Sequence, residues 1–175
     1  IDGPAHASSA IADGNSANGR AFSGAASVNG QVYRATPGSR SDSASPLTGP
    51  LFDVTTIDRT GLACGSLPGS SLAGKVVLIS RGECNFSEKL LVAQQAGAVG
   101  ALVHSREDSP DAVSMDVGDA ILPAASISYG DPLAIKRELA AAAGRTLEIT
   151  INFNPIPVWS DPNRLAQSSS RGPTV

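Results

Sequence analysis

The sequence is poor in the residues that mark several large classes of protein. It has two histidines, two cysteines and three lysines among 175 residues, and aromatic side chains make up 4%. Lys and Arg total 13 against 16 Asp and Glu, which gives a formal net charge of −3 without any basic block. Because nucleic-acid binding needs clustered positive charge, we expect no nucleic-acid partner. The length suits one domain with a buried core.

Long apolar runs are also missing. The longest uncharged apolar stretch, residues 90–103, includes two glutamines, whereas a spanning helix needs about 20 apolar residues. The chain begins at Ile1 without a basic segment followed by an apolar one, so no signal peptide is visible. We therefore expect no membrane span and interpret the sequence as a piece of a longer protein.

The first 49 residues are rich in Gly, Ala, Ser and Asn and contain few large apolar side chains. A segment of this composition does not fold alone. Within it, Asn29 and Gly30 lie between two β-prone runs, and this pair readily adopts the positive φ angles of a two-residue hairpin turn. The pattern predicts a hairpin there, followed by a surface loop over residues 36–50, where Pro, Gly and Ser are frequent.

From residue 51 onward, short β-rich runs alternate with helical periodicity. The run 76–79 is continuously apolar, which is typical of a strand buried on both faces. Residues 147–153 alternate strictly between apolar and polar side chains, which predicts a strand with one solvent-exposed face. In total, strands are predicted over four segments: 51–57, 75–80, 99–104 and 146–153.

A first helix is marked by both of its ends. Asn85, with Glu88 three residues later, matches a capping box, and Gly97 suits the left-handed position after a helix. The strands predicted on either side of this helix complete a βαβ unit. Such a unit predicts parallel pairing with a right-handed crossover.

A second helix begins at Asp131, its expected N-cap, followed by Pro132 at the first helical position. Gly144 closes it after a run of alanines. The expected fold class is therefore α/β, with several strands and two helices.

Cys64 and Cys84 lie twenty positions apart, and neither belongs to a C-x-x-C pair. With few lysines and abundant Ser, Thr and Asn, we interpret the protein as exported and expect one disulfide between them. Two buried thiols in a reducing compartment are the alternative.

The sequence offers little for catalysis. A serine nucleophile needs a base, and the histidines are His6, in the sparse N-terminal segment, and His104, at the end of a predicted strand. Ser105, Glu107 and Asp108 follow His104, but neighbours at a strand end point in different directions, so we interpret them as a surface loop. No G-x-S-x-G motif, phosphate-binding loop or closely spaced ligand pair occurs. We expect no catalytic residue and no metal ligand.

Acidic residues gather in one segment, which we interpret as a solvated loop. Oxygen-rich loops bind calcium, but the EF-hand spacing is absent. Calcium is therefore the alternative interpretation, and we expect no other cofactor. The segment contains Glu107, Asp108, Asp111, Asp116 and Asp119.

One stretch closely resembles a known family. The letters GKVVLISRGECNFSEK over residues 74–89 and AQQAGA over residues 93–98 match the protease-associated (PA) domain, in which a strand leads into Arg-Gly-x-Cys-x-Phe-x-x-Lys and then an Ala-Gln-x-Ala-Gly-Ala helix end. Leu122-Pro123-Ala124 is similar to the family's later Ile-Pro strand. The resemblance covers about residues 51–153. It implies a small swivelling β/β/α-like domain, an open β-barrel or sheet flanked by two helices.

Both ends are similar to other parts of subtilisin-like serine peptidases. The letters NRLA and SSSRGP in the tail resemble the segment that re-enters the catalytic domain after an inserted PA domain, although Ser168 stands where the family has Phe. Pro4 to Ile11 is similar to the catalytic-domain strand before the insertion. The resemblance implies a catalytic triad outside this chain. It also implies four parts: a catalytic-domain stub over 1–20, a hairpin and loop extension over 21–50, the PA core over 51–154 and a returning linker over 155–175.

As a whole, the resemblance implies a non-catalytic, extracellular PA domain of an exported subtilisin-like peptidase. Such domains influence substrate access or selectivity, or mediate protein contacts, including homodimers. The expected partners are the polypeptide substrate and the host catalytic domain. Gly82 lets another backbone approach closely, and Arg81 offers donors to carboxylate or carbonyl oxygens. The expected contact residues are Arg81, Gly82, Glu83, Asn85 and Phe86.

Three alternatives stay open. In the first, Arg81 pairs internally and the domain is a spacer. In the second, the chain is a stand-alone peptide-binding or sorting receptor domain of the same fold. In the third, it is a self-sufficient hydrolase built on His104. The peptidase-like tail argues against the receptor domain.

Overall fold

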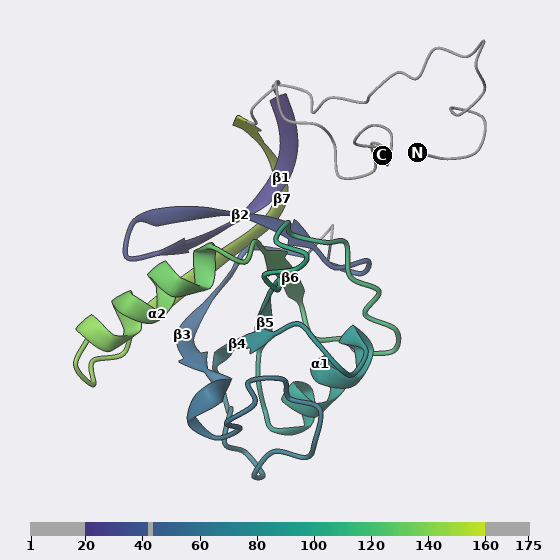
Figure 1. The fold of residues 1–175 in the computed structure, drawn as a ribbon, viewed down its shortest axis with the longest axis vertical. Coiled ribbons are helices and arrows are strands. Elements are labelled where there is room, and N and C mark those ends of the chain that lie inside the picture. The colour runs from purple at the N-terminus through teal and green to yellow at the C-terminus, as the bar shows by residue number, and fades with distance from the viewer. Residues whose placement is uncertain (1–19, 42–43, 160–175) are drawn as a thin grey trace, which may run out of the picture. The chain divides into compact units, whose positions relative to one another are not determined.

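A computed structural model of the chain describes residues 20–41 and 44–159, and within these ranges seven strands close into a barrel (Figure 1). Residues Ser23–Ile156 form one compact unit. The strands are β1 (Arg20–Val28), β2 (Gln31–Pro37), β3 (Leu47–Asp53), β4 (Val76–Ser80), β5 (Gly100–His104), β6 (Ala124–Ile127) and β7 (Glu148–Trp159), and the α-helices are α1 (Phe86–Gln95) and α2 (Asp131–Ala141). Around the barrel the order is β1-β2-β6-β5-β4-β3-β7. The α/β class with two helices is confirmed, and the barrel is closed where an open barrel or sheet was expected.

The middle of the sheet is parallel. β3 pairs with β4, β4 with β5 and β5 with β6 in this sense, and α1 connects β4 to β5. The predicted βαβ unit is therefore confirmed in its parallel pairing. Its register places Ser80 opposite His104, so the last residues of β4 and β5 lie next to each other. The carboxyl ends of β3, β4 and β5 thus meet at one edge of the sheet.

The sheet separates two apolar clusters, because alternate residues of a strand face opposite sides. Val77 and Ile79 of β4 pack with Leu90 of α1 on one side. Val76 and Leu78 pack on the other side with Ile135 of α2 and with the inward residues of β7, which are Ile149, Ile151 and Phe153. The run in β4 is continuously apolar because both of its faces are buried, and β7 alternates because its apolar residues face one cluster.

The hairpin is confirmed, whereas the limits of the following loop were wrong. Asn29 and Gly30 have φ angles of 49° and 81° and connect β1 to β2. The loop expected over 36–50 is shortened because β2 continues to Pro37 and β3 begins at Leu47. β3 starts this early because Leu47 pairs with Ile151 of β7.

The strand expected over 51–57 was also wrong at its far end. Asp53 is the last residue of β3, and its Oδ1 atom accepts the backbone N–H of Thr55 at 3.0 Å. This bond caps a short 3-10 helix, Val54–Thr56, which takes the chain out of the sheet.

Both helices lie where their terminal residues predicted them. The backbone N–H of Asn85 donates to Glu88 Oε2 at 2.9 Å at the start of α1, and Gly97 after its end has φ 92°. For α2 the expected N-cap was wrong by one residue, since Gly130 occupies the cap. Asp131 lies inside the first turn instead, where its carboxylate accepts the backbone N–H of Ser128 at 3.2 Å.

Candidate functional site

The turn that leads from β4 into the first residue of α1, residues 81–86, has an unusual backbone. Gly82 has φ 146° and Glu83 has φ 47°, both in the range that favours glycine. A Cβ atom at Gly82 would lie 3.1 Å from Leu62 Cδ2. The turn thus uses two successive positive φ angles to redirect a buried strand into a helix, and it needs glycine at the first of them.

Arg81 is held at the base of this turn. Its backbone N–H donates to the carbonyl of His104 at 2.9 Å, and its Nη1 donates to Ser109 Oγ at 2.9 Å. The guanidinium carbon lies 6.0 Å from the centre of the Phe86 ring. The ion pairs present in the described ranges join Arg106 to Asp108 and Lys136 to Asp53, so neither involves Arg81.

The outer side of the turn is polar. Glu83 and Asn85 are exposed, while Phe86 is half-buried against the cluster beneath α1. The half-buried Arg81 guanidinium has five N–H donors, and the hydrogen bond to Ser109 uses one of them. The predicted contact residues therefore lie around one turn, interrupted only by Cys84, with donor and acceptor groups on its outer side.

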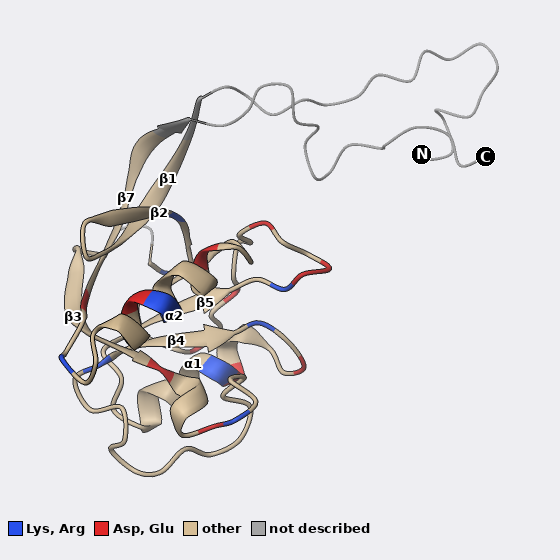
Figure 2. Cartoon of the chain, turned by 60° about the vertical axis from the view of Figure 1, so that its left-hand side comes forward, with Lys and Arg blue, Asp and Glu red and all other residues tan. Residues whose placement is uncertain are grey.

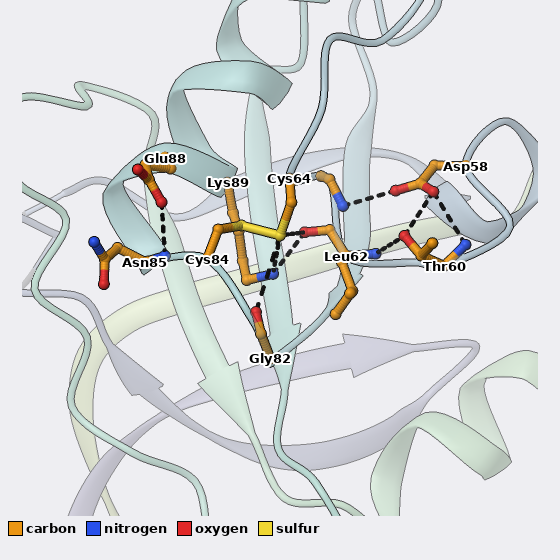
Figure 3. The surroundings of a disulfide bond; sticks show 10 residues. Asp58, Thr60, Leu62, Cys64, Gly82, Cys84, Asn85, Glu88 and Lys89 are labelled. Atoms are coloured by element: carbon orange, nitrogen blue, oxygen red, sulfur yellow. Dashed lines mark hydrogen bonds between the residues drawn. A yellow bond between two sulfur atoms is a disulfide. The ribbon is translucent and has the colours of Figure 1, made fainter.

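A disulfide joins this turn to a neighbouring loop (Figure 3). Cys64 and Cys84 are bonded, with their Cα atoms 5.7 Å apart, so the two cysteines of the sequence are paired. Cys64 is exposed and Cys84 is half-buried. The alternative of two free thiols does not hold in this structure.

Lys89 lies beneath the disulfide and is fully buried. Its Nζ atom donates to the carbonyl of Leu62 at 2.7 Å and lies 3.4 Å from Cys64 Sγ (Figure 3). Burial lowers the pKa of Lys89 to about 8, against the opposing effect of nearby carboxylates, of which Glu83 is the strongest. An unperturbed lysine has a pKa near 10.5, so this ammonium is disfavoured by its surroundings.

The loop that carries Cys64 is organised by Asp58. Its Oδ1 atom accepts from the backbone N–H of Thr60 at 3.0 Å, and its Oδ2 atom accepts from the backbone N–H of Ala63 at 2.8 Å. Burial alone would raise the pKa of this carboxyl, but hydrogen bonds from Thr60, Ala63 and Leu62 outweigh it and lower the pKa. The carboxylate thus fixes the backbone that presents the Leu62 carbonyl to Lys89.

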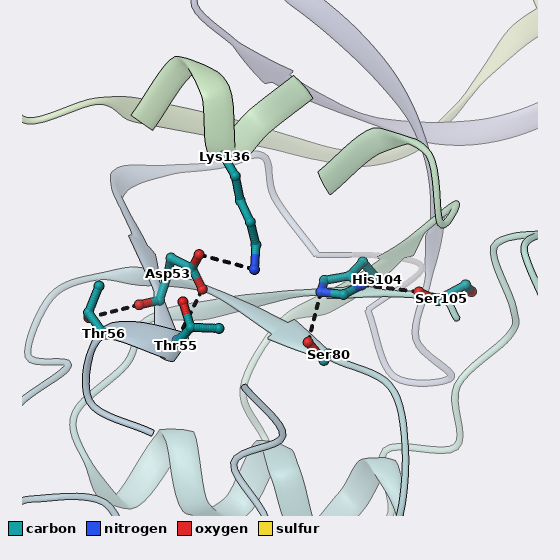
Figure 4. A network of polar contacts seen from close by, with 7 residues as sticks. All are labelled: Asp53, Thr55, Thr56, Ser80, His104, Ser105 and Lys136. Atoms are coloured by element: carbon teal, nitrogen blue, oxygen red, sulfur yellow. Dashed lines mark hydrogen bonds and ion pairs between the residues drawn. The ribbon is translucent and has the colours of Figure 1, made fainter. Parts of the chain in front are cut away.

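A second polar group lies at the carboxyl ends of the parallel strands (Figure 4). Ser80 Oγ is 2.9 Å from His104 Nε2, and His104 Nδ1 is 3.1 Å from the carbonyl of Ser105. Beside them, Lys136 of α2 pairs with Asp53 at 3.2 Å. Burial lowers the pKa of His104, as the Lys136 charge does, while the Ser105 bond and Asp53 act in the opposite direction.

This arrangement differs from the one needed for a hydrolase built from the neighbours of His104. The Ser105 hydroxyl donates to the carbonyl of Asp111 at 2.6 Å, and Asp108 pairs with Arg106 (Figure 2 colours the ribbon at acidic and basic residues). Ser80 was not predicted as the partner of His104. The available signal was the βαβ unit, because its two parallel strands were predicted to end at Ser80 and His104 and therefore side by side. His6 lies outside the described residues, as do the segments 4–11 and 163–173.

Lys89 was likewise not singled out as a functional residue. The available signal was its position four residues before Ala93, which places it on the buried face of α1. For the acidic segment 107–119, the described residues contain no group of three or more Asp, Glu, His or Cys side chains placed to share a metal ion. The calcium hypothesis gains no support from this arrangement.

The family description "PA domain" matches residues 47–135. Probable leucine aminopeptidase 2 of Aspergillus fumigatus is 35% identical over 122 residues, which cover 67% of this chain and 23% of that protein. The chain therefore spans about a quarter of the length of this relative.

Among the solved structures that share the fold are two peptidases. BSAP, a zinc aminopeptidase from Bacillus subtilis, has a TM-score of 0.57 at 20% identity, with 79% of this chain and 31% of that chain covered. A psychrophilic subtilisin-like protease from the Antarctic psychrotroph Pseudoalteromonas sp. AS-11 has a TM-score of 0.50 at 20% identity, with 82% and 34% covered. No helix in the described ranges is both long enough and apolar enough to cross a bilayer.

Proposed function

The chain belongs to the PA domain family, and we propose that it is the non-catalytic PA domain of an exported subtilisin-like serine peptidase. In this proposal the turn over residues 81–86 contacts polypeptide and thereby influences which substrates reach the host's catalytic centre. In this proposal the domain itself cleaves no peptide bond.

The observation that carries the proposal is the chemistry of Arg81. Its guanidinium is anchored by neutral groups, Ser109 and the Phe86 ring, while its charge takes no part in the two ion pairs described above. A guanidinium with remaining donors binds carboxylate and carbonyl oxygens, which every polypeptide offers. Glu83 and Asn85 add an exposed acceptor and an exposed amide beside it.

Two further features support an accessory role in an exported protein. The hydrogen bonds of His104 go to Ser80 and to a backbone carbonyl, while Asp53 is paired with Lys136. The nearby acid is thus engaged elsewhere and does not orient the imidazole. The disulfide between Cys64 and Cys84 is of the kind that persists in oxidising compartments.

The subtilisin-like host rests on the tail over residues 163–173 and on the shared fold with a subtilisin-like protease. An aminopeptidase host is the second candidate, favoured by the 35% identity to Probable leucine aminopeptidase 2. Active-site reagents separate the two in the full-length protein. A fluorophosphonate that abolishes peptidase activity indicates a serine peptidase, whereas loss of activity to a metal chelator alone indicates the aminopeptidase. Self-association of the domain is a further proposal from the family resemblance.

The proposed role is tested by kinetics of the full-length protein with Arg81→Ala. With reduced, carboxymethylated α-lactalbumin as an unfolded substrate, we expect kcat/KM to fall several-fold, while a short chromogenic peptide is cleaved at an unchanged rate. Arg137→Ala is the matched control, since Arg137 is an exposed arginine on α2. Unchanged kcat/KM for both substrates would instead support the spacer.

A further inference from the structure

The contact between Lys89 and the disulfide is asymmetric. The Lys89 Nζ atom donates a hydrogen bond to Cys64 Sγ at 3.4 Å, so the contact is with the Cys64 side of the disulfide. Cys64 is an exposed residue and Cys84 a half-buried one, while Lys89 is fully buried. The sulfur of Cys64 thus lies next to a buried cation.

The surroundings of Lys89 leave its charge poorly compensated. Within the described ranges, the one hydrogen bond from Lys89 Nζ to oxygen goes to the neutral Leu62 carbonyl at 2.7 Å, and neither ion pair there includes Lys89. Buried ammonium groups are unfavourable unless they are paired. A thiolate at Cys64 would supply the missing negative charge at a distance already suited to it.

We propose that this disulfide is a thiol–disulfide exchange site, in which external thiols attack Cys84 and Cys64 leaves as a thiolate stabilised by the Lys89 ammonium. An external thiolate forms a bond to Cys84 Sγ, and the Cys64–Cys84 bond breaks with its electron pair on Cys64. When the reagent is a dithiol, its second thiolate then attacks its own sulfur in the mixed disulfide. Cys84 is released as a thiolate that takes a proton from water. The protein gains two electrons, and the dithiol is oxidised to a disulfide.

The physical basis is the leaving group. Exchange is faster when the departing thiol has a lower pKa, and a neighbouring lysine lowers the pKa of a cysteine thiol. The same charge stabilises the reduced form and so makes the disulfide more oxidising. Opening the bond would disconnect the loop around Cys64 from the turn over residues 81–86. The exchange chemistry does not depend on whether that turn contacts polypeptide.

The test compares Lys89→Met with the wild-type chain in glutathione redox buffers at pH 7. Methionine keeps the length of the buried side chain and removes its charge. We expect the equilibrium to shift about tenfold toward the disulfide, equivalent to about 30 mV for a two-electron couple, and reduction by dithiothreitol to become slower.

Lys75→Met is the matched control, because Lys75 Nζ also donates to a backbone carbonyl, that of Ser71, at 2.8 Å. We expect it to leave both quantities unchanged. Equal potentials and equal reduction rates for Lys89→Met and the wild type would overturn the proposal.

A second measurement needs no substitution and therefore no change in folding. The wild-type chain is mixed with reduced glutathione, quenched rapidly with an alkylating reagent and mapped by peptide mass spectrometry. We expect glutathione on Cys84 and the alkyl group on Cys64. Glutathione found mainly on Cys64 would contradict the assigned leaving group.

Discussion

Ser80 and His104 end two neighbouring parallel strands, and their side chains meet, with Ser80 Oγ 2.9 Å from His104 Nε2. Because His104 Nδ1 lies 3.1 Å from the Ser105 carbonyl, which only accepts, this nitrogen carries the proton. Nε2 is then the acceptor for the Ser80 hydroxyl. The pair thus holds a neutral imidazole in one tautomer at the edge of the sheet.

This pair predicts a loss of stability in acid. Burial lowers the pKa of His104 below 6.5, so the unfolded chain takes up the proton first as the pH falls. Stability due to this group is complete above about pH 6.5 and declines below it. Urea unfolding at pH 7.5 and pH 5 should show a smaller decline for His104→Gln than for the wild type. An equal decline in both would contradict the assignment.

Lys89 predicts a change of stability at alkaline pH. Its pKa is about 8 in the folded chain and 10.5 when unfolded, so between these pH values the unfolded state binds the extra proton. The free energy of unfolding should therefore rise with pH across this interval, by about 3 kcal/mol from this group. Denaturant unfolding at pH 7.5 and pH 10.5 measures the rise. It should be absent in Lys89→Met and retained in Lys75→Met.

Gly82 predicts a large effect from a single methyl group. Alanine at this position would be strained for two reasons. The backbone has φ 146°, and a Cβ atom would lie only 3.1 Å from Leu62 Cδ2. We expect Gly82→Ala to cost roughly 1–3 kcal/mol of unfolding free energy. Gly30→Ala, at φ 81° with nothing within 4 Å, should cost only about 1 kcal/mol. Equal losses for the two variants would show that the turn relaxes freely.

The disulfide predicts a stability difference between oxidised and reduced chain. A bond that closes a loop of 20 residues contributes about 3 kcal/mol on the chain-entropy estimate. Denaturant midpoints with and without a reducing agent, or with Cys64 and Cys84 both replaced by Ser, measure this. Identical midpoints would mean that the loop is equally restricted without the bond.

The parts of the fold that depend on local patterns could be predicted from the sequence. The Asn29-Gly30 hairpin, the capped start of α1 and the βαβ pairing each follow from residues within one or two elements. The early start of β3 could not, because Leu47 is held by Ile151, about a hundred residues away. No local pattern indicates such a partner.

The candidate site divides in the same way. The turn over residues 81–86 could be predicted, because its residues are contiguous and all lie within the Arg-Gly-x-Cys-x-Phe motif. The contacts of Arg81 with Ser109 and of Ser80 with His104 arise only when separate elements assemble. Lys89 could be placed on a helix face, but its position beneath the disulfide depends on the loop that Asp58 organises.

The central claim is that the turn over residues 81–86 is the polypeptide contact of a domain without peptidase activity of its own. Amide NMR of the isotopically labelled chain, titrated with reduced, carboxymethylated α-lactalbumin, tests it most directly. We predict shifts concentrated at residues 81–86 and at Ser109, lost in Arg81→Ala and kept in Arg137→Ala. Shifts confined to other surfaces, or no shifts even at a large excess of the unfolded protein, would contradict the claim.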